Sequence, residues 1–308
     1  MAARVARCLV AARRCAVPAL GRVTCGTAAT WSRPAVRAVS TATPAVHSAA
    51  TPELPPQGAR FQGKVAVVTG AGRDIGAATA LRLAAEGAKV VVHCHASVAG
   101  AEGIVGLIRD QGGEAVMVQA DLATEEGADA LSKAAASLGA EVHVLVHNSG
   151  GLVQRRSLAE MDLAFLRRVM DLNFTSLFMV AQRLAPMMPA GSAIVTLSSQ
   201  AARDGGGPGA GAYAASKGAV HTYTRSLAKE LGAKGVRVNT VTPGMIATGF
   251  HDQFTAPEVR TNVANATLIK REGSAEEVAS VIAFLASDDA GYVTGTALDI
   301  NGGLAFSG

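Results

Sequence analysis

Residues 64–76, with the sequence KVAVVTGAGRDIG, decide the fold of this chain. The run VAVV at 65–68 is apolar at every position, which indicates a strand with both faces buried in a parallel sheet. The glycines that follow permit a tight turn into a helix. Because free N–H groups at the start of a helix bind phosphate, the order strand, glycine-rich turn and helix is typical of a dinucleotide site. The turn residues expected at the cofactor are Gly70, Gly72, Arg73, Asp74, Ile75 and Gly76.

The chain beyond this turn alternates between short apolar runs and longer amphipathic segments. We expect strands over 64–69, 88–93, 115–119, 142–147, 192–198, 235–241 and 296–300, and helices over 75–87, 97–111, 124–138, 162–188, 211–232 and 274–287. Strands that are apolar on both faces and separated by helices predict an α/β fold with a doubly wound, mostly parallel sheet. We therefore expect one Rossmann-like domain over 59–308, with its ligands at the carboxyl ends of the strands.

Residues 1–58 differ in composition from the rest of the chain. They hold seven arginines, no lysine, one acid (Glu53) and no sustained apolar run. An Arg-rich, acid-poor composition is typical of an organellar transit peptide. We predict that 1–58 is a mitochondrial presequence with a linker, which directs the domain to the matrix. A plastid-type transit segment and an untargeted disordered tail are the alternatives. We expect no membrane span, because no stretch is long and apolar enough.

Most of the net positive charge lies in that segment. The formal net charge is +4, but residues 59–308 contain 21 Lys and Arg against 23 Asp and Glu. A nearly neutral domain offers no electrostatic surface for nucleic acid, so we expect no such partner. Three of the four cysteines lie in 1–58, which leaves Cys94 without a disulfide partner inside the domain. We expect no metal site, because no cluster of ligating residues with metal-site spacing stands out.

Asp74 is an unexpected residue in a phosphate-binding turn, because its carboxylate repels phosphate. Asp is also a favoured helix N-cap, and its side chain could accept hydrogen bonds from the N–H groups around Ile75 and Gly76. We favour this interpretation, in which Asp74 caps the helix that follows the turn. The alternative is a loosened phosphate site.

The end of the second expected strand governs the choice of cofactor. Folds that bind NAD commonly place an acid there, which binds the ribose 2′-OH. Residues 93–97 read HCHAS, with no carboxylate. A 2′-phosphate at this place would meet Arg73, His95 and Ser97. The sequence therefore predicts NADP(H) rather than NAD(H).

Four polar residues form the candidate catalytic group. Tyr213 and Lys217 are four residues apart and so share one helix face, Ser199 follows an expected strand, and Asn173 lies in an expected helix. An ammonium group near a phenol lowers the pKa of the phenol. Tyr213 could then donate its proton to a substrate oxygen while Ser199 hydrogen-bonds the same oxygen. Ser198 is the alternative to Ser199.

These motifs, in this order, resemble those of the short-chain dehydrogenases/reductases over residues 60–308. The turn is similar to the family's TGxxxGxG pattern, with Asp74 in place of the middle glycine, and the four polar residues match an Asn–Ser–Tyr–Lys tetrad. The resemblance implies that Lys217 holds the nicotinamide ribose, that Asn173 anchors a water in a proton relay, and that 249–270 form a lid. The cofactor contacts that it implies elsewhere are Asp121, Leu122, Asn148, Gly150, Tyr213, Lys217, Pro243, Gly244, Ile246 and Thr248.

Within that family the motifs resemble 3-oxoacyl-[acyl-carrier-protein] reductases of type II fatty acid synthesis. The resemblance implies an NADPH-dependent reduction of a 3-oxoacyl thioester, acyl carrier protein as a partner and a homotetramer. Arg225, Lys229 and Lys234 are candidates for docking an acidic carrier, although residues 189–191 lack the basic residue that those relatives use. The alternatives are another reductase acting on a hydroxyacyl-CoA, ketone or pteridine substrate, and a non-catalytic NADP-binding subunit. Pteridine reductases share a similar second-strand stretch, but they have Asp where Ser199 stands.

Overall fold

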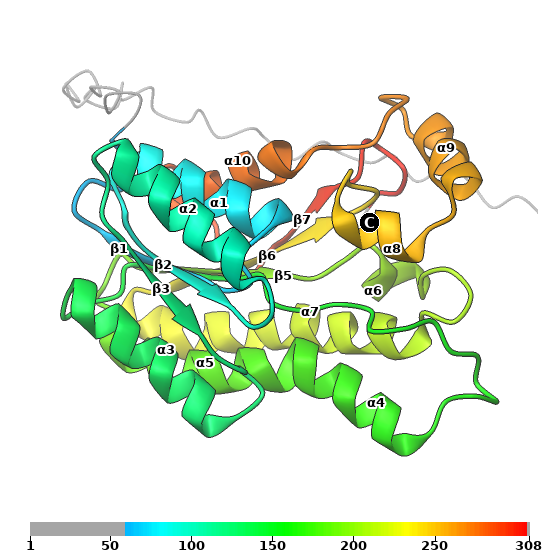
Figure 1. Ribbon diagram of the computed structural model, residues 1–308, viewed down its shortest axis with the longest axis horizontal. Coiled ribbons are helices and arrows are strands. Elements are labelled where there is room, and N and C mark those ends of the chain that lie inside the picture. The colour runs from blue at the N-terminus through cyan, green and yellow to red at the C-terminus, as the bar shows by residue number, and fades with distance from the viewer. Residues whose placement is uncertain (1–58, 307–308) are drawn as a thin grey trace, which may run out of the picture. The chain divides into compact units, whose positions relative to one another are not determined.

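The computed structural model describes residues 59–306, in which seven parallel strands form one sheet (Figure 1). The strands are β1 Val65–Val68, β2 Lys89–Cys94, β3 Ala115–Gln119, β4 Val144–His147, β5 Ala193–Leu197, β6 Arg237–Pro243 and β7 Ala297–Ile300. Their order is β3-β2-β1-β4-β5-β6-β7, so the predicted doubly wound fold is confirmed. β1 and β4 pair directly, and the strand order runs outward in opposite directions from this pair. Ligands of doubly wound folds bind at such a switch point. The predicted presequence and linker lie outside the described residues.

Helices cover both faces of the sheet (Figure 1). On one face lie α1 Asp74–Ala85, α2 Val98–Asp110 and α10 Ala275–Ala286. On the other face lie α3 Glu125–Leu138, α4 Leu163–Met170, α5 Ser176–Leu184 and α7 Gly211–Leu231. Short helices beyond the carboxyl ends of the strands are α6 Ala201–Asp204, α8 Gly249–Phe254 and α9 Pro257–Ala266. Single 3-10 turns are formed by Ala185–Met187, Gly232–Lys234 and Asp288–Ala290.

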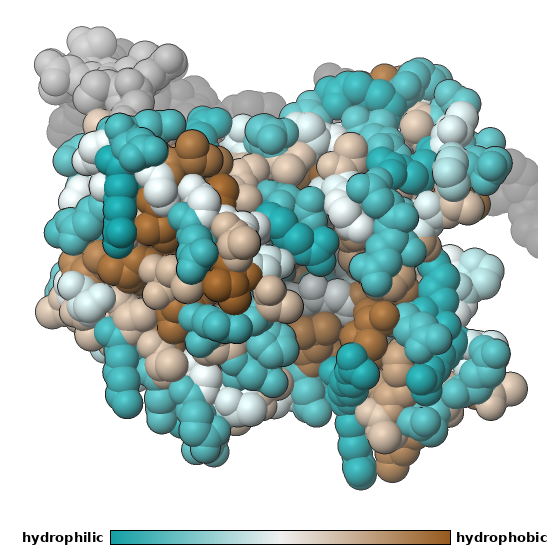
Figure 2. Space-filling model, viewed as in Figure 1, coloured by the Kyte–Doolittle hydropathy of each residue, from teal (hydrophilic) through white to brown (hydrophobic). Residues whose placement is uncertain are grey.

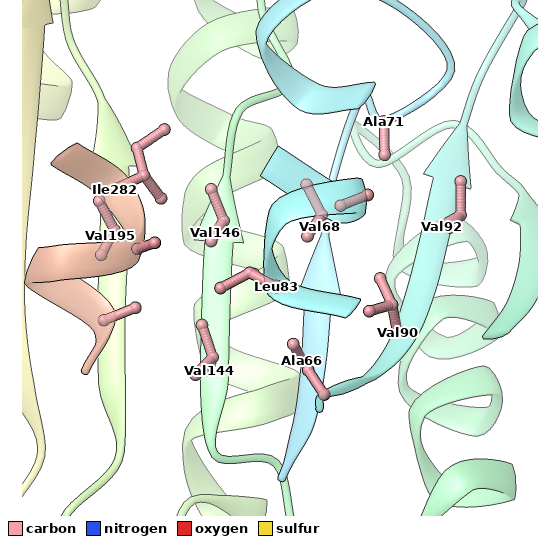
Figure 3. Packing of buried hydrophobic residues seen from close by; sticks show 14 of the residues in the cluster. Ala66, Val68, Ala71, Leu83, Val90, Val92, Val144, Val146, Val195 and Ile282 are labelled. Carbon is pink, nitrogen blue, oxygen red and sulfur yellow. The ribbon is translucent and has the colours of Figure 1, made fainter. Parts of the chain in front are cut away.

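Successive residues of the central strand β1 point to opposite faces of the sheet. Ala66 and Val68 belong to the core beneath α1 and α10, whereas Val67 belongs to the core on the side of α3 and α5. Figure 3 shows Leu83 of α1 and Ile282 of α10 lying over strand side chains of the first core. Both faces of β1 are therefore covered by apolar side chains, which explains why its sequence is apolar at every position.

The helix expected over 162–188 is interrupted. Between α4 and α5, Asp171–Thr175 form a π-helical turn, in which the backbone hydrogen bonds span five residues instead of four. The fully buried side chain of Asn173 lies in this turn, and its Nδ2 donates to Val169 O and Gly151 O, both at 2.9 Å. The expectation of a regular helix is wrong at this point: the π turn interrupts it, and Asn173 in this turn bonds Gly151, which lies outside the helix.

The face of the domain that Figure 2 shows is mostly hydrophilic, with separate hydrophobic areas and a hollow near its centre. Within residues 59–306, none of the helices combines the length and the apolar character that crossing a bilayer would require. The same residues bring no three His, Cys, Asp or Glu side chains together in an arrangement that could hold a metal ion.

Candidate active site

A cavity of about 760 Å³ lies at the carboxyl ends of the strands. Its wall combines the β1–α1 turn, the ends of β2, β4, β5 and β6, and the helices α7, α8 and α9. The predicted site residues that line it are Gly70, Gly72, Arg73, Asp74, Ile75, His95, Ser97, Asn148, Gly150, Ser199, Tyr213, Lys217, Pro243, Gly244, Ile246 and Thr248. Four others, Gly76, Asp121, Leu122 and Asn173, are not part of its lining.

The glycine-rich turn is packed too closely for side chains. A Cβ atom on Gly76 would lie 2.2 Å from the carbonyl oxygen of Gly70, and one on Gly72 would lie 2.6 Å from the carbonyl oxygen of Ser97. Gly70 also has a left-handed φ of +63°. Glycine is therefore required for the turn to pack against α1 and Ser97, and Gly70 and Gly72 line the cavity, where a pyrophosphate site needs close approach of the backbone.

His93 hydrogen-bonds the backbone of this turn, a role that was not predicted from the sequence. Its Nδ1 accepts a hydrogen bond from Gly70 N at 3.1 Å, and its Nε2 lies 3.0 Å from Ala120 O. These two bonds assign the proton to Nε2. Burial lowers the pKa of His93 to about 4, so the ring is neutral at physiological pH. The sequence feature that could have indicated this role is a histidine near the end of a strand that is otherwise mostly apolar.

Asp74 does not cap its own helix, so the predicted N-cap is wrong. Asp74 is the first residue of α1, its φ is +52°, and the N-cap position belongs to Arg73, whose side chain makes no capping bond. The Asp74 carboxylate instead accepts hydrogen bonds from Gly249 N, at 3.2 Å, and from Arg73 Nη1, also at 3.2 Å. Gly249 is the first residue of α8. Asp74 therefore binds the N-terminus of a different helix, 175 residues away in sequence.

The end of β2 places an imidazole and a hydroxyl side chain on the cavity wall. His95 and Ser97 line the cavity together with Arg73, whose side chain is 58% exposed. Asp121, at the end of β3, instead uses its carboxylate to accept from Ala123 N at 3.0 Å, and the Leu122 side chain is buried in the core. The implied contacts of Asp121 and Leu122 with a cofactor stay predictions.

Tyr213, Ser199 and Lys217 meet at one point of the cavity. Ser199 lies close enough to the Tyr213 phenol to affect its pKa, and Lys217 Nζ lies 5.9 Å from the centre of the Tyr213 ring. Lys217 Nζ also donates to Leu197 O at 2.8 Å. Ser198, the alternative serine, is buried and donates to Lys217 O at 2.9 Å. The geometry therefore favours Ser199 as the hydroxyl that acts beside the phenol.

Burial shifts the pKa values of both titratable groups. It lowers the pKa of Lys217 to about 8, and it raises the pKa of Tyr213, although the hydrogen bond from Ser199 opposes that rise. We expected the ammonium to lower the pKa of the phenol. In the protein alone the desolvation of Tyr213 outweighs any such effect, because 5.9 Å from the ring centre is not a direct contact.

Asn173 acts on the site through its neighbours. Its Oδ1 accepts from Gly151 N at 3.0 Å, so the π turn is tied to the end of β4. A Cβ atom on Gly150 would lie 2.5 Å from Asn173 Oδ1 and 2.8 Å from Lys217 Nζ, so glycine at 150 lets both side chains approach. Asn148 links β4 to the glycine-rich turn, because its Nδ2 donates to Gly70 O at 3.0 Å. The implied water at Asn173 stays a prediction.

His147 is a second buried histidine near the site. Its Nε2 lies 3.4 Å from Ser176 Oγ in α5. Burial and then the charge of Lys217 lower the pKa of His147 to about 3, so this side chain is neutral.

The expected lid begins with α8 and α9, and both contribute to the cavity wall. Phe250 lies with its ring centre 5.8 Å from that of Tyr213 and 5.2 Å from that of Phe254. Arg260 of α9 pairs with Asp252 of α8. The lid therefore places an aromatic surface directly beside the phenol.

Comparisons with known proteins agree with this architecture. A family model described as enoyl-(acyl carrier protein) reductase matches residues 70–305. The chain is 39% identical to the 3-oxoacyl-[acyl-carrier-protein] reductase of Synechocystis over 78% of this chain and 96% of the relative. It is 35% identical to the 7α-hydroxysteroid dehydrogenase of Escherichia coli over 79% and 95% of the two chains.

A solved structure agrees as well. The crystal structure of a short-chain dehydrogenase from Burkholderia cenocepacia in complex with NADP is similar, with a TM-score of 0.75 and 32% identity. The match covers 80% of this chain and 99% of that chain. With its parallel sheet, its glycine-rich turn and the Ser199–Tyr213–Lys217 group, this chain belongs to the short-chain dehydrogenase/reductase family of oxidoreductases.

Proposed function

We propose that this protein reduces a 3-oxoacyl thioester to the 3-hydroxyacyl form with NADPH. The observation that carries the proposal is that Ser199, Tyr213 and the buried Lys217 line one cavity, with Lys217 Nζ 5.9 Å from the centre of the Tyr213 ring. These groups line the same cavity as the glycine-rich turn. A proton donor and a dinucleotide cradle in one cavity suit the reduction of a carbonyl group.

The residues present fit NADP(H). The turn residues Gly70 and Gly72 line the cavity at the start of α1, where backbone N–H groups suit a pyrophosphate. Arg73, His95 and Ser97 line the cavity where a 2′-phosphate would bind, and residues 93–97 contain no carboxylate that would repel it. The similar structure from Burkholderia cenocepacia is in complex with NADP, which supports the same choice.

The chain's own residues supply the acid chemistry. NADPH, when bound, supplies the hydride. Tyr213 keeps its proton at neutral pH, because burial raises its pKa, and it donates this proton to the substrate oxygen. Ser199 donates a hydrogen bond to that oxygen, where negative charge develops. Lys217 keeps a proton below its pKa of about 8, and its positive charge stabilises the phenolate that remains.

The 3-oxoacyl substrate rests on the resemblance of the motifs and on the Synechocystis relative. The apolar lining at Leu152, Phe250, Val259 and Val263 is compatible with an acyl chain. Another carbonyl substrate is the second candidate, because a relative of similar identity is a hydroxysteroid dehydrogenase. The presence of Ser199, Tyr213 and Lys217 in one cavity disfavours a non-catalytic NADP-binding subunit.

The test is NADPH oxidation by the full chain with acetoacetyl groups on acyl carrier protein, on CoA and in a simple ester. We expect kcat/KM with either carrier to exceed that with the ester, and NADPH to be preferred over NADH by at least about tenfold. The Tyr213→Phe variant is the control for non-enzymatic oxidation. Reduction of the ester alone would favour another ketone substrate, and no oxidation with any ketone would favour the non-catalytic subunit.

We also propose that residues 1–58 direct the protein to the mitochondrial matrix and that it assembles as a homotetramer. The Arg-rich, acid-poor composition of 1–58 and the family resemblance support these two proposals. A fusion of 1–58 to a fluorescent protein tests the first, and the mass of the purified enzyme in solution tests the second. A cytosolic fusion protein and a monomer are the contrary results.

A further inference from the structure

Arg155 projects from the β4–α4 loop and lines the wall of the cavity. Its guanidinium joins two separate segments: Nε donates to Phe254 O in α8 at 3.0 Å, and Nη1 donates to Pro208 O at 2.9 Å. Pro208 lies in the loop between α6 and α7, and its neighbour Gly207 lines the cavity. Arg155 therefore lies between the lid and this loop, on the cavity wall that also holds Phe250.

The charge of Arg155 has no acidic partner among residues 59–306. Its neighbour Arg156 differs, because it lies 3.5 Å from Asp162 and stacks over the Phe165 ring at 4.4 Å. Arg73, the other arginine on the cavity wall, pairs with Asp74. A guanidinium on a cavity wall without a carboxylate partner attracts an anion from the ligand.

The guanidinium also has donors to spare. A guanidinium has five N–H groups, and two of those of Arg155 bond backbone carbonyls. Its Nη2 makes no hydrogen bond within the described part of the chain. Because the two carbonyls fix the plane of the group, the free N–H groups are held in one orientation before a ligand arrives.

Neither acid on the cavity wall, Asp74 or Asp204, forms an ion pair with Arg155. Asp204 lines the same cavity, but its Oδ1 accepts from Gly206 N at 2.8 Å and its Oδ2 accepts from Gln200 Nε2 at 3.2 Å. Burial lowers the pKa of His251, the charge of Arg260 lowers it further, and Arg155 makes the smallest contribution in the same direction. The charged groups of α8 and α9 differ from Arg155, because Arg260 is paired with Asp252 and Glu272.

We propose that Arg155 is a specificity-determining residue that binds carboxylate or phosphate oxygens of the substrate at the mouth of the cavity. It thereby selects carbonyl substrates that carry negative charge away from the reacting carbon. The inference rests on the proposed function and narrows its substrate class to anionic thioesters. Two sources share this chemistry: the phosphate of a carrier's pantetheine arm and a carboxylate at the far end of the acyl chain.

The test compares matched thioesters of the same 3-oxoacyl group with the full chain and NADPH. The neutral reference is the N-acetylcysteamine thioester. One anionic arm is the 4′-phosphopantetheine thioester, and the other is an N-acetylcysteamine thioester whose acyl chain ends in a carboxylate. We expect at least one anionic arm to be preferred over the neutral reference in kcat/KM, mainly through KM, and that arm identifies the source of the charge.

The Arg155→Gln variant should lower this preference by at least about tenfold, because a charge-assisted hydrogen bond is lost. Arg155→Lys keeps the charge without the planar fork and should retain part of the preference. Arg156→Gln is the matched control, since Arg156 already pairs with Asp162, and it should leave the preference within about threefold. Melting temperatures of all variants show whether a variant acts by loosening the loop, which would lower the melting temperature, or by losing a contact with the substrate, which would not.

Two results would overturn the inference. In one, the wild-type enzyme reduces neutral and anionic thioesters equally well. In the other, Arg155→Gln slows all thioesters by the same factor, which would assign Arg155 to tying loops together. If no thioester is reduced, the proposed function fails instead. Binding of 4′-phosphopantetheine to the NADPH-loaded protein then tests Arg155 directly, and equal affinity for wild type and Arg155→Gln would overturn the inference.

Discussion

Replacing Asp74 with asparagine should tighten NADPH binding by about threefold to tenfold. The carboxylate is attached to the first residue of α1, so a phosphate on the free N–H groups of that helix would lie roughly 5 to 8 Å away. With an effective dielectric constant of about 40 for this partly exposed group, two unit charges at such distances repel by about 1 to 1.7 kcal/mol. That range corresponds to roughly sixfold to sixteenfold in Kd, and the pairing of Arg73 with Asp74 reduces it.

Comparing Asp74→Asn with Asp74→Gly distinguishes the effect of the Asp74 charge from the effect of its hydrogen bond to Gly249 N. Asparagine removes the charge but keeps an acceptor for Gly249 N, and it tolerates the left-handed φ of +52°. Asp74→Gly removes the charge and the acceptor together. Both variants should therefore tighten NADPH binding, but only the glycine variant should leave the first N–H of α8 unpaired, at a cost of about 1 kcal/mol to that helix.

Two assays read these effects separately. Fluorescence titration gives the Kd for NADPH at low salt and at about 0.5 M salt, where screening should shrink the gain in affinity. Limited proteolysis with mass spectrometry reports the opening of α8, and cleavage near 249–254 should speed up in Asp74→Gly and stay unchanged in Asp74→Asn. The reasoning is refuted if asparagine weakens NADPH binding, or if the tightening is equally large at both salt concentrations.

Three other predictions concern the acid group and the turn. Tyr213→Phe should lower kcat by about 100-fold or more and leave the Kd for NADPH within about threefold, as steady-state kinetics and fluorescence titration would show. Burial lowers the pKa of Lys217 to about 8, so the ammonium loses its proton as the pH rises through that value. We therefore expect kcat/KM for reduction to fall above about pH 8, and a flat profile from about pH 7 to 9 would contradict this. Gly76→Ala would place a Cβ 2.2 Å from Gly70 O, and it should lower the melting temperature and weaken NADPH binding at least tenfold by the rough measure of one lost phosphate contact. Gly103→Ala in α2 is its control, because that Cβ would meet no atom within 4 Å and should raise stability by up to about 1 kcal/mol.

Much of the fold could be predicted because buried parallel strands have a strong sequence signal. The strand expected over 115–119 matches β3 in full, and the helix expected over 211–232 ends one residue beyond α7. The glycine-rich turn and the Tyr213–Lys217 pair could be predicted because the spacing of residues within one element determines which of them lie on the same side. Local periodicity and local spacing are properties of neighbouring residues, so one sequence suffices to predict them.

Features that depend on distant segments could not be predicted. The partner of the Asp74 carboxylate lies in α8, which no local pattern links to the first turn. The acceptor role of His93 depends on the Gly70 N–H group, which belongs to a turn more than twenty residues earlier. The π turn at Asn173 adds one residue to a helix of otherwise ordinary composition, so periodicity does not reveal it.

The π turn makes this part of the chain sensitive to insertions and deletions as well as to the loss of Asn173. Loss of one residue between Val169 and Ser176 would allow an unbroken α-helix to form. Each residue of an α-helix turns it by about 100°, so everything after the deletion would rotate by that angle. Leu177, Val180 and Leu184, now in the core, would then face other directions. A shift of one residue in the length of this segment would therefore disturb the core on this side of the sheet.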